Sequence, residues 1–267
     1  MSTSETAPRL VVQAASLGYA DRTICHDLDV SIPDAAITVI VGPNACGKST
    51  LLRALSRLLK PTSGQILLDG KPLASYGAKE LARQVGLLPQ TSIAPDGITV
   101  ADLVSRGRFP HQSLLHQWSA QDDEAVRSAM ERTDVSHLAV RAVDELSGGQ
   151  RQRVWVAMAL AQQTPILLLD EPTTFLDIAH QVEVLELCQD LNRSEGKTVV
   201  AVLHDLNQAC RYADHLIAMK DGAIVAQGRP GEVITAGVVE AVFGLKCLII
   251  DDPVTGTPLV VPLAGGR

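Results

Sequence analysis

The chain is predicted to fold as an α/β protein built on a mainly parallel sheet. Short, almost wholly apolar runs of the kind found in buried parallel strands recur along its 267 residues. Segments with helical spacing lie between or after these runs. Strands separated by helices form a twisted parallel sheet, and its binding sites lie at the carboxyl ends of the strands. The apolar runs cover residues 37–41, 85–88, 166–169 and 198–203.

Helices and N-terminal strands complete this core. Strand character occurs at residues 9–12 and 24–32, and in the second of these segments Leu28, Val30 and Ile32 alternate with polar residues. Helical periodicity predicts helices at residues 49–59, 150–161 and 178–191.

Two regions depart from the alternation of strands and helices. Between residues 98 and 145 the buried-strand signal vanishes, while 101–106 and 122–133 look helical, which predicts a helical insertion. Near the C-terminus, strand-like residues 247–250 and 258–261 flank a Pro- and Gly-containing turn, which predicts a hairpin.

The composition argues against several classes of protein. With 46% apolar and 20% charged residues, the chain can bury a sizeable core, and 3% aromatic residues leave that core to Leu, Val, Ala and Ile. A net charge of -7 argues against a nucleic-acid partner bound through a broad basic surface. The longest uncharged stretch, 154–169, is interrupted at 162–165 and is too short to span a membrane. Residues 1–8 lack the apolar core of a signal peptide. The five cysteines include no C-x-x-C pair and are typical of free thiols in a reducing compartment, so we expect a cytosolic protein.

The strongest local signal is a glycine-rich loop that follows the apolar run 37–41 and opens a helix. It matches the pattern G-x-x-x-x-G-K-[ST], in which backbone N–H groups and the helix N-terminus bind phosphate. Lys48 is placed to reach the β- and γ-phosphates of a nucleotide, and the Ser49 hydroxyl to ligate Mg²⁺. We expect the Lys48 side chain to be exposed in the empty site. The loop consists of Gly42, Pro43, Asn44, Ala45, Cys46, Gly47, Lys48, Ser49 and Thr50.

A second signal is the apolar run 166–169, which ends in Asp170 and Glu171. A buried strand that ends in acids places carboxylates at the edge of the sheet where the phosphate loop is expected. We predict that Asp170 holds Mg²⁺, directly or through water, and that Glu171 polarises an attacking water molecule. Without the phosphate loop, the same pattern would indicate only solvated charge at a strand end.

A second glycine-rich turn, Leu146-Ser147-Gly148-Gly149-Gln150, also leads into a helix and offers another anion-binding N-terminus. Followed by Arg151-Gln152-Arg153, it resembles the signature motif of the ATP-binding-cassette (ABC) ATPases. In that family, the signature of one subunit closes over the nucleotide held by the phosphate loop of another.

The resemblance covers roughly residues 9–245 and implies a single ABC ATPase domain over residues 1–267. It implies a P-loop NTPase (RecA-like) core over 9–97 and 159–245, with an N-terminal antiparallel β-subdomain. It also implies an inserted helical subdomain over 98–158, which carries the signature. Residues 246–267 then form the hairpin-like C-terminal extension.

Further family positions match residue by residue. Tyr19 matches the aromatic residue that stacks on adenine, and Gln90 the glutamine that touches Mg²⁺ and senses the transmembrane partner. Asp177, after Leu176, matches the acidic residue of the loop that crosses the dimer interface. His204 matches the histidine that contacts the γ-phosphate. The resemblance therefore implies an ATPase that uses ATP and Mg²⁺, with Glu171, His204 and Lys48 as catalytic residues.

Two residues depart from the family pattern. Ala45 stands where many members have glycine, which requires either a negative φ or mild strain at this position. Phe175 precedes Leu176 where a small residue is common, and it can alter packing at the dimer seam without touching the chemistry.

Three stretches resemble the ATPase subunits of bacterial importers for ferric siderophores, haem and cobalamin, and they cover residues 106–111, 176–181 and 204–209. We favour an iron-chelate cargo, while importers of manganese or zinc share the same ancestry. The implied partners are integral membrane permease subunits, a second copy of the chain and, indirectly, an extracytoplasmic substrate-binding protein. The implied location is the cytoplasmic face of the cell membrane, with the helical insertion and the segment after Gln90 as the docking surface for the permease.

The sequence argues against two other classes of ATPase-like protein. An ABC-type ATPase of DNA repair or chromosome maintenance would carry coiled-coil arms or zinc modules, and the sequence has neither heptads nor cysteine pairs. A non-hydrolysing regulatory subunit would be expected to have a degenerate site, whereas both Glu171 and His204 are present.

Overall fold

The computed structural model describes residues 8–20, 22–90, 94–112 and 118–263. The chain forms two compact units: unit 1 is Met1–Ser75 with Thr198–Arg267, and unit 2 is Tyr76–Lys197. Parallel and antiparallel strands occur together with helices, and the predicted α/β class with N-terminal antiparallel strands is confirmed.

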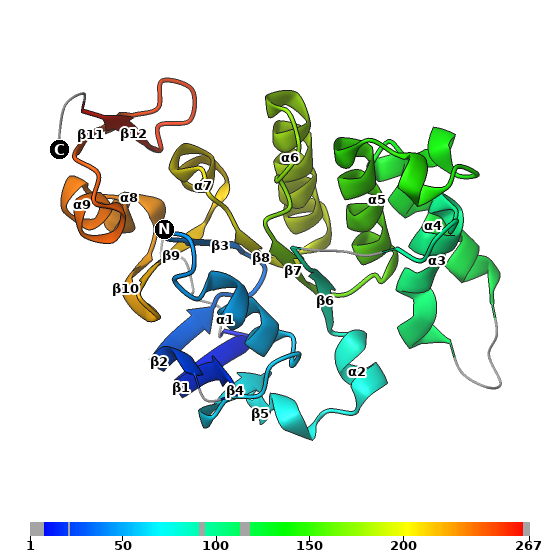
Figure 1. Ribbon diagram of the computed structural model, residues 1–267, viewed down its shortest axis with the longest axis horizontal. Coiled ribbons are helices and arrows are strands. Elements are labelled where there is room, and N and C mark those ends of the chain that lie inside the picture. The colour runs from blue at the N-terminus through cyan, green and yellow to red at the C-terminus, as the bar shows by residue number, and fades with distance from the viewer. Residues whose placement is uncertain (1–7, 21, 91–93, 113–117, 264–267) are drawn as a thin grey trace. The chain divides into compact units, whose positions relative to one another are not determined.

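Unit 1 contains an antiparallel sheet in which long strands near the N-terminus pair with a later hairpin (Figure 1). Its order is β2 (Arg22–Ile32), β1 (Leu10–Tyr19), β4 (Ser63–Leu68) and β5 (Lys71–Pro72). From Leu28 to Ile32, β2 alternates buried apolar and exposed residues, because one face packs on the core and the other faces solvent. Helix α1 (Lys48–Leu55) contacts β1 and β2.

Unit 1 also contains the central parallel strands. β3 (Ile37–Val41) lies between β8 (Thr198–Val202) and β9 (His215–Lys220), both parallel to it. Every residue of β3 and β8 is buried, as expected for parallel strands with both faces covered. β10 (Ala223–Gly228) pairs antiparallel with β9.

Short helices and a hairpin complete unit 1. The helices are α7 (Leu206–Tyr212), α8 (Pro230–Val233) and α9 (Ala236–Phe243). β11 (Cys247–Asp251) and β12 (Pro258–Pro262) form an antiparallel hairpin, and β12 contacts α7 (Figure 1).

Unit 2 combines a parallel strand pair with a group of helices. β6 (Val85–Leu88) pairs in parallel with β7 (Ile166–Asp170). The α-helices of unit 2 are α2 (Ala78–Ala82), α3 (Val100–Ser105), α4 (Ala120–Arg132), α5 (Gly148–Ala161) and α6 (Ile178–Glu195). Of these, α3, α4 and α5 contact one another.

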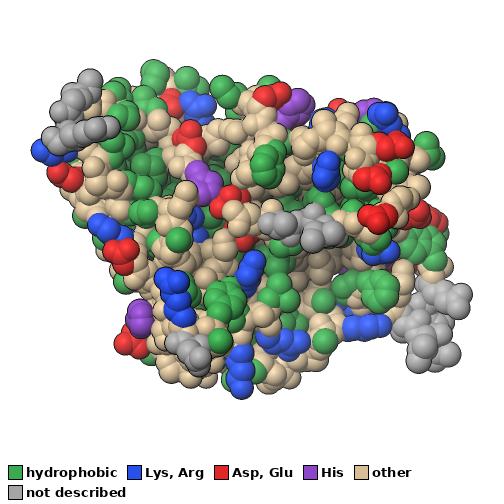
Figure 2. All heavy atoms as spheres, in the orientation of Figure 1, with side chains coloured by type: hydrophobic (Ala, Val, Ile, Leu, Met, Phe, Trp, Pro, Cys, Tyr) green, Lys and Arg blue, Asp and Glu red, His purple; other side chains and the backbone are tan. Residues whose placement is uncertain are grey.

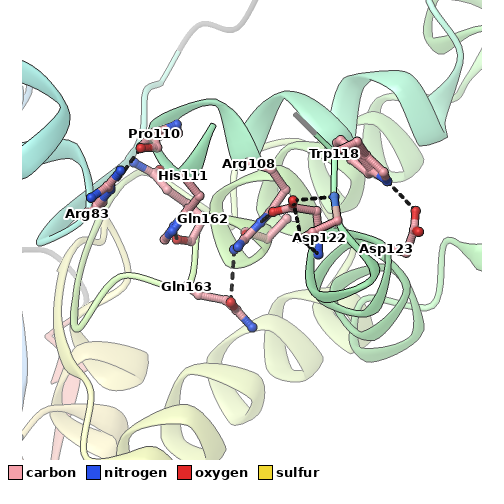
Figure 3. A network of polar contacts seen from close by, with 11 residues as sticks. Arg83, Arg108, Pro110, His111, Trp118, Asp122, Asp123, Gln162 and Gln163 are labelled. Atoms are coloured by element: carbon pink, nitrogen blue, oxygen red, sulfur yellow. Dashed lines mark hydrogen bonds and ion pairs between the residues drawn. The ribbon is translucent and has the colours of Figure 1, made fainter. Parts of the chain in front are cut away.

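A buried ion pair holds the segment after α3 against α4 and the end of α5 (Figure 3). Arg108 Nε donates to Asp122 Oδ1 at 2.7 Å, and Arg108 Nη1 donates to Ala161 O at 2.8 Å and Gln163 Oε1 at 2.9 Å. Burial alone would raise the pKa of Asp122, but hydrogen bonds from Arg108 and Ser119 outweigh it and hold that pKa below its usual value. The carboxylate therefore stays ionised at neutral pH and keeps the arginine paired.

All four predicted apolar runs are strands in the structure, within one residue at their ends. The helix predicted at 49–59 ends at Leu55, because Arg57 adopts the left-handed conformation with φ 62°. Among the described residues, no helix has both the length and the apolar character that a membrane span requires.

Candidate nucleotide-binding site

The phosphate loop connects β3 to α1 in unit 1 and requires glycine at two points. Gly42 has φ 156°, and a Cβ there would come within 2.3 Å of Met219 O. Gly47 has φ 108°, and a Cβ there would lie 2.6 Å from Cys25 Sγ. Both contacts are too close for any side chain, so the loop passes close to β9 and β2 only because these residues are glycines.

The start of α1 has no side-chain cap. Gly47 is its N-cap residue, and without a side chain it caps none of the N–H groups of the first turn. The N-terminal N–H groups of a helix have no intrahelical partner, and together with the helix dipole they favour an anion. The loop thus presents N–H donors suited to a phosphate group.

Lys48 is buried, with 5% of its surface exposed, so the expectation of an exposed side chain in the empty site was wrong. Its Nζ donates to Gly42 O and to Pro43 O, each at 2.8 Å. These hydrogen bonds fold the side chain back across the loop and compensate for the burial of its charge. An ammonium group has three donors, so the same nitrogen can also bind a phosphate oxygen.

The remaining loop residues differ in exposure. Ala45 has φ 63°, so the strained alternative of the two expectations for this residue holds. Asn44 and Ala45 are exposed and Ser49 is half-buried, whereas Cys46 and Thr50 are buried.

Tyr19 and His204 lie in the same unit as the phosphate loop. Tyr19 ends β1 with 43% of its surface exposed, and Arg53 Nη1 of α1 donates to its hydroxyl at 3.2 Å. The tyrosine is therefore not a buried strand residue. His204 is exposed and directly precedes Asp205. Asp205 caps α7, because its Oδ1 accepts hydrogen bonds from Asn207 N and Gln208 N. The histidine itself is thus not the helix cap.

The two acids lie at the end of β7 in unit 2. Asp170 is the last residue of the strand and is 2% exposed. Glu171 is half-buried in the left-handed conformation with φ 55°, and Thr174 Oγ1 donates to its Oε2 at 3.2 Å. Thr174 was not predicted from the sequence, although its spacing of three residues from Glu171 allows the contact.

The signature turn caps α5 in unit 2. Ser147 Oγ accepts from Gln150 N at 3.3 Å, and Ser147 N donates to Gln150 Oε1 at 3.1 Å, which is a capping box. Ser147 and Gly148 are exposed, and Gly149 is half-buried. A Cβ on Gly148 would lie 3.6 Å from Phe175 Cβ, so the turn packs beside the segment that precedes α6.

That segment carries Asp177, which caps α6. Asp177 Oδ1 accepts from His180 N at 3.0 Å and lies 2.7 Å from His180 Nδ1. These hydrogen bonds, first that from the His180 backbone, lower the pKa of the Asp177 carboxyl. Phe175, with φ 67°, is 80% exposed and Ile178 is 78% exposed, so large apolar side chains flank the cap. Gln90, the remaining predicted site residue of unit 2, is exposed after β6.

Each unit thus brings together part of the predicted site. Unit 1 holds the phosphate loop, Tyr19 and His204, and unit 2 holds the paired acids, the signature turn, Asp177 and Gln90. Sequence reasoning missed Arg53, which orients Tyr19, and His180, which orients Asp177. The N-cap spacing of three residues could have found His180, whereas Arg53 carries no local signal.

A phosphate loop between a buried strand and a helix, with a second buried strand that ends in acids, defines a P-loop nucleotide-binding protein. The family model described as ABC transporter matches residues 25–174, more than half of the chain. The chain therefore belongs to the ABC transporter family, as one of its ATPases.

Relatives extend the match to nearly the whole chain. The ferric enterobactin transport ATP-binding protein FepC of Escherichia coli (strain K12) is 58% identical over 97% of this chain and 96% of its own length. The probable siderophore transport system ATP-binding protein YusV of Bacillus subtilis (strain 168) is 54% identical over 96% of this chain and 93% of its own. A dimeric structure of a bacterial ABC transporter cassette has a TM-score of 0.75 at 27% identity, over 82% of this chain and 98% of that chain.

Proposed function

We propose that this chain is the ATP-hydrolysing subunit of an importer of ferric siderophores. The observation that carries the proposal is the 58% identity to the ferric enterobactin protein over 97% of this chain. Identity of this extent reaches far beyond the motifs common to ABC ATPases. A cobalamin import protein of Halobacterium salinarum is only 41% identical, and the match covers 63% of its length. Cobalamin is therefore an alternative cargo, and haem and metal ions are further alternatives from the resemblance of the sequence.

Unit 1 supplies the groups that hold the nucleotide. The N–H groups from Gly42 to Thr50 surround the phosphates, and Lys48, already fixed by two carbonyl oxygens, adds its charge. The exposed ring of Tyr19 stacks on the adenine, with Arg53 holding its hydroxyl.

The donor set fits Mg²⁺. Ser49, Gln90 and Asp170 offer hydroxyl, amide and carboxylate oxygens, which are the hard ligands this ion prefers. Among the described residues, no group of three or more His, Cys, Asp and Glu could hold a metal ion. Bound there together with the nucleotide, Mg²⁺ would neutralise charge that develops on the phosphates.

Glu171 acts as the general base. Its carboxylate is half-buried at the end of β7 and is oriented by the hydroxyl of Thr174. It accepts a proton from the attacking water molecule, while the exposed imidazole of His204 contacts the γ-phosphate.

Two copies of the chain form the complete sites. The exposed signature turn at Ser147 and Gly148 closes over the nucleotide of the other copy, and Asp177 lies at the seam. The exposed apolar side chains of Phe175 and Ile178 beside this turn support the pairing, because a partner surface would bury them. ATP bridges the two copies and thus favours the closed dimer, and loss of the γ-phosphate reopens it.

The closing and reopening of the dimer is transmitted to separate subunits of a transporter. Permease subunits that span the membrane dock on the helical insertion and on the segment after Gln90. Part of that segment, residues 91–93, lies outside the described residues. The chain then works at the cytoplasmic face of the membrane, and an extracytoplasmic binding protein delivers the cargo from the other side.

Uptake in a strain that lacks this gene tests the cargo. We expect the parental chain to restore uptake of labelled iron supplied as a ferric siderophore, and the Glu171→Gln chain to fail although it is produced equally. Restoration of cobalamin or haem uptake without iron-siderophore uptake would replace the proposed cargo with one of the alternatives.

A further inference from the structure

The two edges of the C-terminal hairpin follow from its hydrogen-bond register. Leu263 N donates to Lys246 O, and Asp252 N donates to Thr257 O. Bonded and non-bonded pairs alternate along an antiparallel ladder. The bonded pairs in between are therefore Leu248 with Val261 and Ile250 with Leu259, in the observed register. The backbone groups of the intervening residues on each strand point to its outer edge.

The outer edge of β12 is closed. Its outward positions are Pro258, Val260 and Pro262, and the two prolines have no N–H to donate. Val260 N donates to Asn207 Oδ1 at 2.7 Å, and Asn207 Nδ2 donates to Val260 O at 3.4 Å. No further strand can pair along this edge.

The outer edge of β11 is open. Its outward residues are Cys247, Ile249 and Asp251, none of which is proline or lysine, the residues that commonly block an edge. Within the described ranges, the backbone groups of these residues have no hydrogen-bond partner. A short row of unpaired donors and acceptors thus runs along one side of the hairpin.

The outward face of the hairpin is wholly apolar. It carries Leu248, Ile250, Leu259 and Val261, of which Leu248 is 55%, Ile250 49% and Val261 36% exposed. Figure 2 shows hydrophobic side chains at the surface over β11 and β12, at the upper left of the view. An open edge beside an exposed apolar face is the combination that recruits another strand.

We propose that β11 pairs antiparallel with β11 of a second copy of this chain. In the register that pairs all the outward backbone N–H and C=O groups of β11, Ile249 lies opposite Ile249 of the partner subunit. Cys247 then lies opposite the partner's Asp251, and Leu248 opposite the partner's Ile250. No like charges meet, apolar residues pair with apolar residues, and the arrangement has the two-fold symmetry that a homodimer requires.

The place of the hairpin in the fold favours a second copy over an unrelated strand. Asn207 holds β12 to α7, and Arg211 of the same helix pairs with the buried Asp252 at 2.7 Å. Helix α7 begins just after His204, which the proposed function places at the γ-phosphate of the nucleotide that the other copy closes over. This inference rests on that proposed pairing of two copies. It adds a contact that needs no nucleotide and keeps the copies together when the ATP sites open.

Disulfide formation between two different cysteine variants of the chain tests both the contact and its register. In the proposed pairing, position 248 faces position 250 of the partner in a non-bonded pair, with Cα atoms about 4.5 Å apart, within disulfide range. The full-length Leu248→Cys chain is mixed with a tagged Ile250→Cys chain, without nucleotide, and oxidised with copper phenanthroline. We expect a reducible heterodimer from the mixture and little from either variant alone. The native cysteines are all buried and should contribute little.

A matched control comes from the closed strand of the same hairpin. A mixture of Leu259→Cys and Val261→Cys changes residues of the same outward face, but on β12, and should cross-link no more than the parental chain. Equal cross-linking of the two mixtures would overturn the proposal, as would dimers formed by the Leu248→Cys chain alone, which need another register.

A second measurement does not depend on cysteine. Ile250→Lys places a charge beside the open edge, whereas Val254→Lys makes the same type of change in the turn, where Val254 is 81% exposed. We expect only Ile250→Lys to weaken nucleotide-free self-association in sedimentation, with ATP binding unchanged in both. Unaltered association of Ile250→Lys would refute the hairpin contact. A parental chain that does not bind ATP would instead count against the proposed function.

Discussion

The molecule has two glycine-rich turns that lead into helices, and they differ in how their first N–H groups are satisfied. At α1 the N-cap is Gly47, which offers no side-chain acceptor, and the loop is tightly packed. At α5 the N-cap Ser147 and Gln150 satisfy each other in a capping box, and Ser147 is exposed. The N-cap of the first helix therefore caps none of its N–H groups, whereas the capping box of the second engages the N–H groups of Ser147 and Gln150.

This difference assigns the two turns different tasks. The phosphate loop is preorganised, so a single chain can bind nucleotide with it. The capping box of the signature turn engages only the N–H groups of Ser147 and Gln150, and in the proposed function the turn contacts a phosphate only when a partner brings one. In the proposed function, nucleotide binding therefore needs one chain and hydrolysis needs two.

The largest effect that separates binding from hydrolysis is expected at the end of β7. Glu171→Gln removes the general base and its charge, so hydrolysis should fall by about 10²–10⁴-fold while ATP binding persists. Asp170→Asn should weaken Mg-ATP binding itself. Bound nucleotide after gel filtration and phosphate release measure the two effects. Parental turnover of Glu171→Gln would exclude it as the base, and loss of its ATP binding would mean that the two acids have exchanged roles.

Changes of charge at the two turns should likewise separate ATP binding from hydrolysis. Lys48→Ala should abolish ATP binding by the single chain, because the loop loses the cation that faces the phosphates. Ser147→Arg should leave that binding nearly intact yet stop hydrolysis in the assembled transporter, where a bulky cation obstructs the seam. Nucleotide affinity of the isolated chain and ATPase activity of the complex are the readouts. Normal hydrolysis by the Ser147→Arg complex would contradict the two-copy site.

Adding one methyl group at each turn is a finer comparison. In Gly47→Ala the new Cβ would lie 2.6 Å from Cys25 Sγ at φ 108°, and this strain should cost about 1–3 kcal/mol of unfolding free energy. In Gly148→Ala the nearest atom is 3.6 Å away, so stability should change by less than about 0.5 kcal/mol. Urea unfolding monitored by circular dichroism checks both. Equal stabilities would show that the phosphate loop is not tightly packed.

The smallest effect concerns the base of the nucleotide. Tyr19→Ala removes the stacking ring and should weaken ATP binding by about 1–3 kcal/mol, while the turnover of bound ATP changes less. Tyr19→Phe keeps the ring and loses only the hydrogen bond from Arg53, so it should bind nearly as the parent does. Titration calorimetry with ATP measures both variants. If Tyr19→Ala bound ATP with the parental affinity, the ring of Tyr19 would not stack on the adenine.

Much of the fold could be predicted because buried parallel strands have a local signature. The runs that became β3, β6, β7 and β8 stand out as apolar segments bounded by polar residues. β10 was missed, since its residues alternate between exposed and half-buried and none is fully buried. β9 was also missed, although the Asp221-Gly222 pair that joins it to β10 is a hairpin turn signal that could have found both strands.

The sequence by itself determined the family of the chain, and it predicts which residues bind phosphate, hold a metal ion and activate water, because that chemistry depends on residue type and close spacing. Tertiary structure alone decided that Lys48 is buried, that Ala45 is strained and that Phe175 is exposed. It also decided that Asn207 closes the edge of β12 at Val260, while the edge of β11 stays open. Burial, strain and edge pairing are relations between segments far apart in the chain, so no local pattern encodes them.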